Sequence, residues 1–150
     1  MDREDGSDHE DTRTPRNPKT KGYEPLPPQT EFIAKEVVDA AMHVHKKLGP
    51  GLLESVYEVC LAHELKKRRI PVETQVALPI VYDGIQLDAG YRIDMLVQKC
   101  IIVELKAAEV ATPLFEAQLL TYLKLTGHRL GLLINFNVPL LKDGIKRLIL

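Results

Sequence analysis

The chain has 150 residues, and its 20 Lys and Arg nearly balance 21 Asp and Glu to give a formal net charge of −1. This length suits one domain with a sizeable core, and the near-neutral charge gives no overall signal for a nucleic-acid or membrane surface. No apolar run approaches the ~18 residues of a membrane span, and the N-terminal residues lack the apolar stretch of a secretory signal. Two cysteines are too few for a disulfide framework or a zinc knuckle, so we expect a cytoplasmic protein without a membrane partner.

Residues 1–28 are polar and charged, and they hold five of the ten prolines. Such a segment buries too little apolar surface to offset the conformational entropy lost on folding. We therefore expect a disordered tail over residues 1–28 and a folded domain over residues 29–150.

Two amphipathic helices are predicted at the start of this domain. The first begins near Thr30, a favourable N-cap residue, and stops before Gly49. Its apolar residues recur at helical spacing, at Ile33, Val37, Ala41, Val44 and Leu48. The second follows Pro50 and Gly51 and ends in the basic run of residues 66–69. Its expected apolar stripe consists of Leu53, Val56, Tyr57, Cys60, Leu61 and Leu65.

After Pro71 the pattern becomes that of β-strands. Residues 73–82 alternate and are rich in β-formers, and Asp83-Gly84 is a strong two-residue hairpin signal before a strand over residues 85–97. Another strand is expected over residues 101–107. Because apolar residues occupy both faces of the last two strands, helices should cover both sides of the sheet.

The rest of the chain adds one helix and one strand. The helix should run from Pro113 to Thr126, with Gly127 closing it. A buried strand is predicted from Leu130 to Phe136, and a turn at Asp143-Gly144 precedes a short apolar tail over residues 145–150. The order α-α-β-β-β-α-β predicts an α/β (α+β) domain, a sandwich around a mixed sheet.

Three charged residues, Asp94, Glu104 and Lys106, interrupt two strongly apolar strand segments. An unpaired charge in a buried sheet costs several kcal/mol or forces a pKa shift. Glu104 and Lys106 are two residues apart on one strand, so their side chains share a face of the sheet.

The position of Asp94 depends on the hairpin loop. If residues 98–100 form a three-residue loop, Val97 pairs with Ile101 and Asp94 lies opposite Glu104. A two-residue loop would send Asp94 to the other face. The three-residue loop therefore predicts two carboxylates that can hold a hard cation, with a lysine beside them.

The motifs and their order resemble a known family. Gly51-x-x-Glu54-x-x-Tyr57 resembles the signature of the GxxExxY family. Asp94 followed by Glu104-x-Lys106 resembles the D…ExK core of the PD-(D/E)XK nuclease superfamily, to which that family belongs, and Gln118-x-x-x-Tyr122 resembles the QxxxY element of its RecB-like branch. The resemblance covers roughly residues 29–150 and implies a restriction-endonuclease-like core with magnesium-dependent nuclease activity.

The resemblance also implies roles for individual residues. Asp94, Glu104 and the backbone carbonyl of Leu105 would hold Mg²⁺, for which Mn²⁺ can substitute. A bound Mg²⁺ lowers the pKa of a water and stabilises developing charge, and Lys106 would orient the water or stabilise the pentavalent phosphate. Glu54 would complete the metal shell, directly or through water, although an acidic residue in the first turn also simply complements the helix N-terminus.

Four further residues are candidates for the wall of the site. Gln118 and Tyr122 share a helix face and could hold a phosphate or a water of the metal; the alternative is a plain amphipathic surface. Tyr57 lies one turn after Glu54, with core packing and a hydrogen-bonded hydroxyl as its alternative. His45 is a candidate because related nucleases can carry a helix histidine near the metal, the alternative being a surface or core histidine.

The basic run of residues 66–69 could contact phosphates, but four bases at a helix C-terminus also complement the helix dipole. The sequence contains no G-x-S-x-G motif and no P-loop, which excludes the common serine hydrolase and ATPase classes.

These observations predict a Mg²⁺-dependent nuclease that hydrolyses phosphodiester bonds of nucleic acid, DNA rather than RNA, with a homodimer as an open option. The alternative is a non-catalytic binding or scaffold module that retains the nuclease fold. The near-neutral charge of residues 29–150 favours the alternative, because nonspecific nucleic-acid binding relies on clustered basic surface. The Asp, Glu and Lys set favours the enzyme, because a scaffold has no need of three charges in apolar strands.

Overall fold

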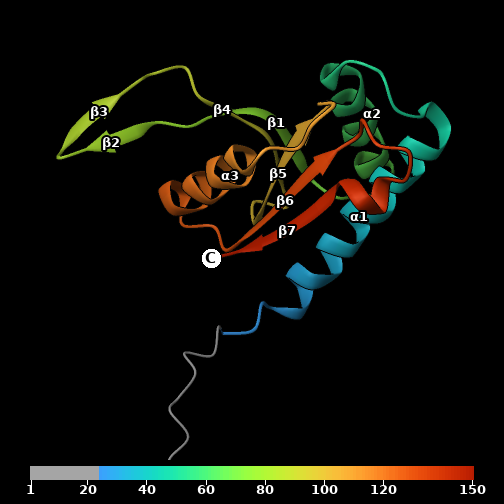
Figure 1. Cartoon of the computed structure of the whole chain (residues 1–150). Coiled ribbons are helices and arrows are strands. Elements are labelled where there is room, and N and C mark those ends of the chain that lie inside the picture. Colours follow the sequence, from blue (N-terminus) through green and yellow to red (C-terminus); the bar gives the residue numbers. More distant parts are fainter. Residues whose placement is uncertain (1–23) are drawn as a thin grey trace, which may run out of the picture.

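A computed structural model describes residues 24–150 (Figure 1). Most of the predicted tail over residues 1–28 therefore lies outside the described residues, and the division of the chain at residue 28 stays a prediction. Within the described part Leu26 is buried in the core, and the Arg129 guanidinium donates a hydrogen bond to the Glu24 carbonyl. The ordered region thus includes residues before Thr30.

Helix α1 spans Pro28–Leu48 and begins two residues before the predicted cap at Thr30, which lies inside the helix. The difference has a simple cause. Pro27 is the N-cap and Pro28 occupies the first turn, where the fixed φ of proline suits a helix and its missing N–H costs nothing.

Helix α2 spans Glu54–Lys67 and buries a narrower stripe than the sequence predicts. Tyr57, Leu61 and Leu65 are buried, but Leu53 is 73% exposed and Val56 is 38% exposed. Leu53 precedes the first turn, and Val56 points about 100° around the helix from Tyr57. The predicted stripe is therefore wrong at these two positions.

A five-stranded sheet forms the centre of the domain, in the order β1-β4-β5-β6-β7. Its strands are β1 (Val72–Ala77), β4 (Arg92–Val97), β5 (Ile101–Lys106), β6 (Leu130–Asn135) and β7 (Ile145–Ile149). All neighbours are antiparallel except β5 and β6, which are parallel. The sheet is therefore mixed, as predicted.

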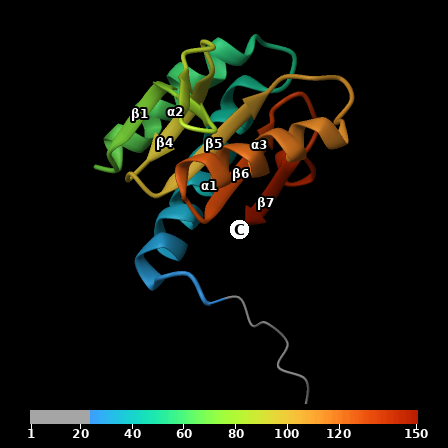
Figure 2. The ribbon, with the colours of Figure 1, turned by 90° about the vertical axis from the view of Figure 1, so that its left-hand side faces the viewer.

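Helices cover both faces of this sheet, which confirms the prediction from its apolar strands. Helices α1 and α2 pack on one face and α3 (Pro113–Thr126) on the other (Figure 2). Ile101 and Val103 belong to the core under α1 and α2, whereas Ile102 belongs to the core under α3. Helix α3 is a crossover between the parallel strands β5 and β6, and its bounds agree with the prediction. Gly127 ends it in the left-handed conformation.

Two predicted strands are each divided in the structure. The segment over residues 73–82 yields β1 and β2 (Ile80–Tyr82), and the segment over residues 85–97 yields β3 (Ile85–Leu87) and β4. Strands β2 and β3 pair only with each other, joined by the predicted two-residue turn, in which Asp83 and Gly84 both have positive φ. They form an arm that projects from the body of the domain (Figure 1).

The predicted apolar tail over residues 145–150 is instead mostly strand β7, which pairs antiparallel with β6. A short 3₁₀ turn, η1 (Leu141–Gly144), precedes it at the predicted turn position. This strand is not evident from the sequence, because five residues without regular alternation of apolar and polar side chains give little period-2 signal.

Candidate active site

The hairpin between β4 and β5 brings the two predicted carboxylates together. Its loop has three residues, since Val97 pairs with Ile101 and Met95 with Val103. The prediction of a three-residue loop is therefore confirmed, and the regular pairing of the two strands ends at Met95, one residue before Asp94. Ile93 belongs to the core under α3 and Met95 to the core under α1 and α2, so the alternation of side chains breaks at Asp94, whose carboxylate is directed toward β5.

The two carboxylates bond to backbone groups of the facing strands. The Asp94 backbone N–H donates to Glu104 Oε1 at 3.1 Å, and the Leu105 backbone N–H donates to Asp94 Oδ2 at 2.8 Å. Where the backbone pairing of β4 and β5 stops, these two carboxylates therefore accept the hydrogen bonds that backbone carbonyls accept elsewhere in the sheet. Because N–H and C=O of one strand residue point to the same neighbouring strand, the Leu105 carbonyl also faces this gap.

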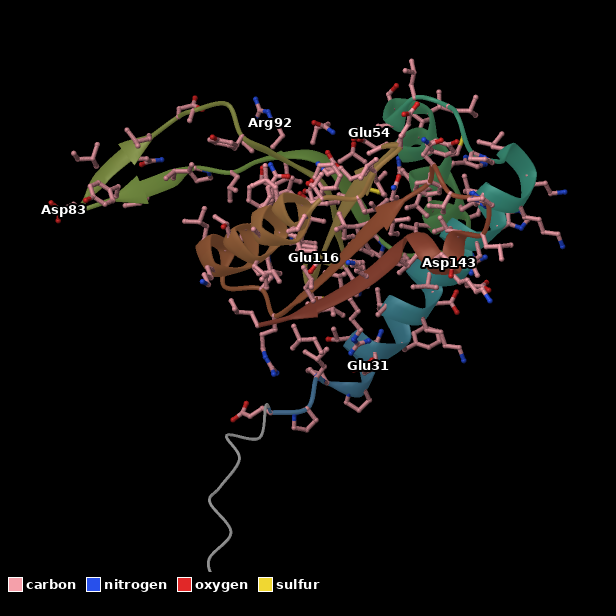
Figure 3. The ribbon with its side chains drawn as sticks, viewed as in Figure 1. Glu31, Glu54, Asp83, Arg92, Glu116 and Asp143 are labelled. Carbon is pink, nitrogen blue, oxygen red and sulfur yellow. The ribbon has the colours of Figure 1, made fainter. Side chains whose placement is uncertain are left out.

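The gap between the strands is electrostatically unusual. Glu104 is only 4% exposed, and its burial, with the Asp94 carboxylate as the second cause, raises its pKa to about 8 from an ordinary 4.5. Burial also raises the pKa of Glu54, while the Lys106 ammonium opposes that rise. Glu54 opens α2 near the end of β5 (Figure 3). A buried carboxylate beside a half-buried one favours a proton or a cation between the two.

Lys106 follows on the same strand and is held by α3. Its Nζ donates to Gln118 Oε1 at 3.4 Å and lies 4.7 Å from the centre of the Phe115 ring. Tyr122, one turn after Gln118, is buried, and its pKa is raised by burial and then by the Glu104 carboxylate. The predicted pair Gln118 and Tyr122 therefore lines the same side of the site, and Phe115 is a residue that the sequence analysis missed.

The strand on the other side of Asp94 adds a second missed contact. Gln75 in β1 has a φ of 51°, although it is not glycine, and the β1–β4 pairing skips Gln75 and Asp94. Its side-chain amide donates to Glu58 at 2.8 Å and approaches Asp94 Oδ1 at 3.5 Å. Non-glycine residues with positive φ often mark functional positions; here the strained residue lies beside the carboxylate pair.

A comparison with protein-family models matches residues 31–148 to the PD-(D/E)XK nuclease superfamily. The chain belongs to this superfamily. The match covers all five strands of the main sheet except the last residue of β7, together with α2, α3 and most of α1. Searches against curated proteins and solved structures gave no significant match. The superfamily consists of nucleases, and its assignment agrees with the observed mixed sheet flanked by helices.

Nucleases of the PD-(D/E)XK superfamily typically use divalent metals, so the donor set of this member matters. Within residues 24–150, no three His, Cys, Asp or Glu side chains gather closely enough to form a complete metal cage. Asp94 and Glu104 nevertheless supply two hard oxygen donors, and burial followed by the Asp94 carboxylate raises the pKa of Glu104. This set fits a cation such as Mg²⁺, which accepts one or two carboxylates and keeps several waters.

Two predicted wall residues of this PD-(D/E)XK domain lie elsewhere. The fully buried Tyr57 hydroxyl donates to the Gly49 carbonyl at 2.7 Å and accepts from the Leu52 N–H at 3.1 Å, and its ring stacks on Phe136. His45 Nε2 lies 2.8 Å from the Val138 carbonyl. The structure therefore does not bring Tyr57 or His45 to the carboxylate pair; Tyr57 instead holds the loop that leads to Glu54.

The basic run at the end of α2 has ion-pair partners in the domain. Arg68 contacts Glu36 at 3.1 Å and Asp39 at 2.7 Å, and Lys67 contacts Glu64 at 3.1 Å. The Asp39 carboxylate, and to a smaller extent that of Glu36, raises the pKa of Arg68. Arg68 thus links α2 to α1, in keeping with a structural role.

No helix within the described residues combines the length and the apolar composition of a membrane span.

Asn135 is another residue that sequence reasoning missed. It ends β6 beside Lys106 in the β5–β6 register and is buried. Its Oδ1 accepts from the Ala108 and Asn137 backbone N–H groups at 3.1 Å, and its Nδ2 donates to the Ala108 carbonyl at 3.0 Å. Asn135 therefore fixes the segment that leaves β5 just after Lys106.

Replacing Asn135 should destabilise the domain. Asn135→Ala leaves several partly buried backbone groups unpaired, so we expect a loss of about 2–4 kcal/mol in the free energy of unfolding. Urea denaturation would measure it, with Asn137→Ala as the control. A variant as stable as the wild type would show that water replaces these hydrogen bonds without cost.

Proposed function

We propose that this domain is a Mg²⁺-dependent nuclease that hydrolyses phosphodiester bonds, with DNA as the preferred substrate. The main support is the pair Asp94 and Glu104, whose carboxylates bond across the gap between β4 and β5, with the Lys106 ammonium close enough to act on Glu104. Burying two carboxylates against each other opposes folding, and an inert scaffold would gain nothing from it. We also propose that the chain belongs to the GxxExxY group and the RecB-like branch, on the motifs around Glu54 and Gln118.

In this proposal Asp94, Glu104 and the Leu105 carbonyl hold the cation, and Mn²⁺ can replace Mg²⁺. When bound, the cation activates water for attack and offsets negative charge on the phosphate. Lys106 stabilises charge that develops on the phosphate oxygens, and Gln118 and Phe115 hold the Lys106 side chain in place. Tyr122 covers Glu104 and limits the access of bulk water.

Glu54 acts through a water in this arrangement. Burial raises the pKa of Glu54; the Lys106 ammonium opposes this rise and the Asp94 carboxylate adds to it, so Glu54 interacts electrostatically with both residues. It does not, however, form a three-carboxylate cluster with Asp94 and Glu104. A water between Glu54 and the cation satisfies both observations.

The Glu54→Gln variant should weaken Mn²⁺ binding while changing the stability of the metal-free protein by less than about 1 kcal/mol, the scale of a charge at a helix end. Isothermal titration with Mn²⁺ and a thermal melt in chelator measure the two quantities. Glu73→Gln, at an exposed position of β1, is the matched control. Equal Mn²⁺ affinity in both variants would assign Glu54 only to the helix N-terminus.

A cleavage panel tests the proposed activity. Single-stranded, double-stranded and branched DNA, and RNA, are incubated with the full chain in Mg²⁺, in Mn²⁺ and in chelator. We expect cleavage of DNA that requires metal and is lost in Asp94→Asn but kept in Asp88→Asn, an exposed residue outside the site. Metal binding by the wild type with no cleavage of any substrate would contradict catalysis and favour the binding module.

A further inference from the structure

The arm formed by β2, β3 and their turn (Ile80–Leu87) is covered by no other element of the described chain. Its strands pair only with each other, and Val81, Tyr82, Ile85 and Leu87 are all exposed. Asp83 marks its far tip (Figure 3). An isolated two-stranded ribbon is marginally stable in water, and its unpaired edges and apolar side chains favour association with another surface.

The chain also carries an apolar groove at the root of this arm. The groove has a volume of about 330 Å³ and lies between Ile80 and Tyr91 at the root and Leu114, Gln118, Tyr122 and Leu125 of α3. Leu114 and Leu125 are exposed on its rim. The same molecule thus has an apolar projection and an apolar recess.

We propose that two copies of this chain form a twofold dimer in which the arm tip of each copy occupies the groove of the other. In such an interface residue i of one copy contacts residue j of its partner and the reverse contact follows from symmetry. Because the groove lies at the root of the arm, two arms that lie side by side in opposite directions place each tip over the other root. A single twofold axis therefore generates both arm–groove contacts, so that neither arm and neither groove is left uncovered.

Exposed area and charge both favour a second copy as the occupant. The large apolar residues of the arm, with Tyr91, Leu114 and Leu125, expose an area on the order of the ~800 Å² that each partner of a stable dimer buries. Residues 78–91 carry Asp83 and Asp88 but no Lys or Arg, so the arm would repel phosphates rather than bind them. Lys124, exposed in the last turn of α3 next to the groove residue Leu125, is available as a partner for the acidic tip.

The dimer would also enclose the nuclease site. Gln118 lines the groove and holds Lys106, so the arm of the second copy would wall the outer side of the proposed site. The dimer itself does not depend on the proposed nuclease activity.

Sedimentation equilibrium of the full chain over a wide concentration range tests the proposal. We expect a wild-type dimer, and a dissociation constant at least about 30-fold weaker for Tyr82→Glu and for Leu125→Lys, since each puts a charge into the apolar arm–groove contact. Val59→Glu, at an equally exposed apolar position on α2, should dimerise like the wild type. Unchanged melting temperatures would show that all three variants fold.

Mixing the two variants provides the decisive measurement. A mixed pair of Tyr82→Glu and Leu125→Lys keeps one native arm–groove contact and gains a Glu–Lys pair in the other. Native mass spectrometry of equal amounts of the two variants should therefore detect the mixed dimer at well above the twofold excess over each self-dimer that random pairing alone gives. A wild type that stays monomeric, a wild type that dimerises only on added DNA, or variants that dimerise like the wild type would overturn the proposal.

Discussion

Lys106→Ala should lower phosphodiester cleavage by a factor of at least ~100, the scale for losing one preorganised contact to the transition state. The same variant should bind Mg²⁺ or Mn²⁺ at least as tightly as the wild type, because it removes a positive charge beside the cation. Lys106 is not among the proposed metal ligands, and Gln118 and Phe115 keep its ammonium on the α3 side of the site. Cleavage of the best substrate of the panel and Mn²⁺ titration measure the two effects.

Lys99→Ala is the matched control for this variant, because Lys99 lies in the loop of the same hairpin but not at the site. It should retain full cleavage. Equal cleavage by wild type and Lys106→Ala, at a rate that still depends on metal, would contradict the role given to Lys106. Loss of metal binding in Lys106→Ala would instead show that the lysine supports the carboxylate pair.

Glu104→Gln should change how the stability of the metal-free protein depends on pH. The pKa of Glu104 is about 8 in the folded chain against an ordinary value of 4.5. Between these two values the unfolded chain has released the proton that the folded chain still binds. The free energy of unfolding of the wild type should therefore fall as the pH rises through this window, by up to roughly 1.4 kcal/mol per pH unit.

Glutamine resembles the protonated carboxyl group and can still accept the Asp94 N–H, so Glu104→Gln should lack this slope and exceed the wild type in stability near pH 8. It should also lose Mn²⁺ binding, whereas Mn²⁺ binding by the wild type should strengthen as the pH rises toward the pKa of Glu104. Denaturant titrations in chelator and Mn²⁺ titrations at both ends of the window measure these effects. Glu73→Gln should follow the wild-type profile, and an identical profile for Glu104→Gln would mean that Glu104 ionises normally.

Local signals explain which parts of the fold were predictable. Helix α3 agrees with its predicted bounds because Pro113 suits a first helical turn and Gly127 supplies the left-handed stop. The hairpin register followed from the length of one loop. The split of the long β-segments did not follow, because β1 and β2, like β3 and β4, carry continuous strand-forming sequence and only tertiary packing separates the arm from the sheet.

The residues of the site likewise fall into those that local sequence predicts and those that only tertiary packing brings to the site. The spacing of Asp94, Glu104 and Lys106 depends on one hairpin, so the sequence could predict that these three residues lie close together. Gln75, Phe115 and Asn135 approach the site from other elements, and no short pattern links them to it. Tyr57 and His45 lie on the expected helices, but their polar atoms bond to backbone carbonyls of loops, a choice that sequence spacing does not reveal.

The crossed hydrogen bonds of the carboxylate pair have a spectroscopic consequence. The backbone amides of Asp94 and Leu105 donate directly to Glu104 and Asp94. A proton or a cation that reaches either carboxylate must alter the electron density at these two N–H groups. In an amide NMR spectrum of the labelled protein, the peaks of Asp94 and Leu105 would therefore act as built-in reporters of the charge state of the site, without any substrate or added probe.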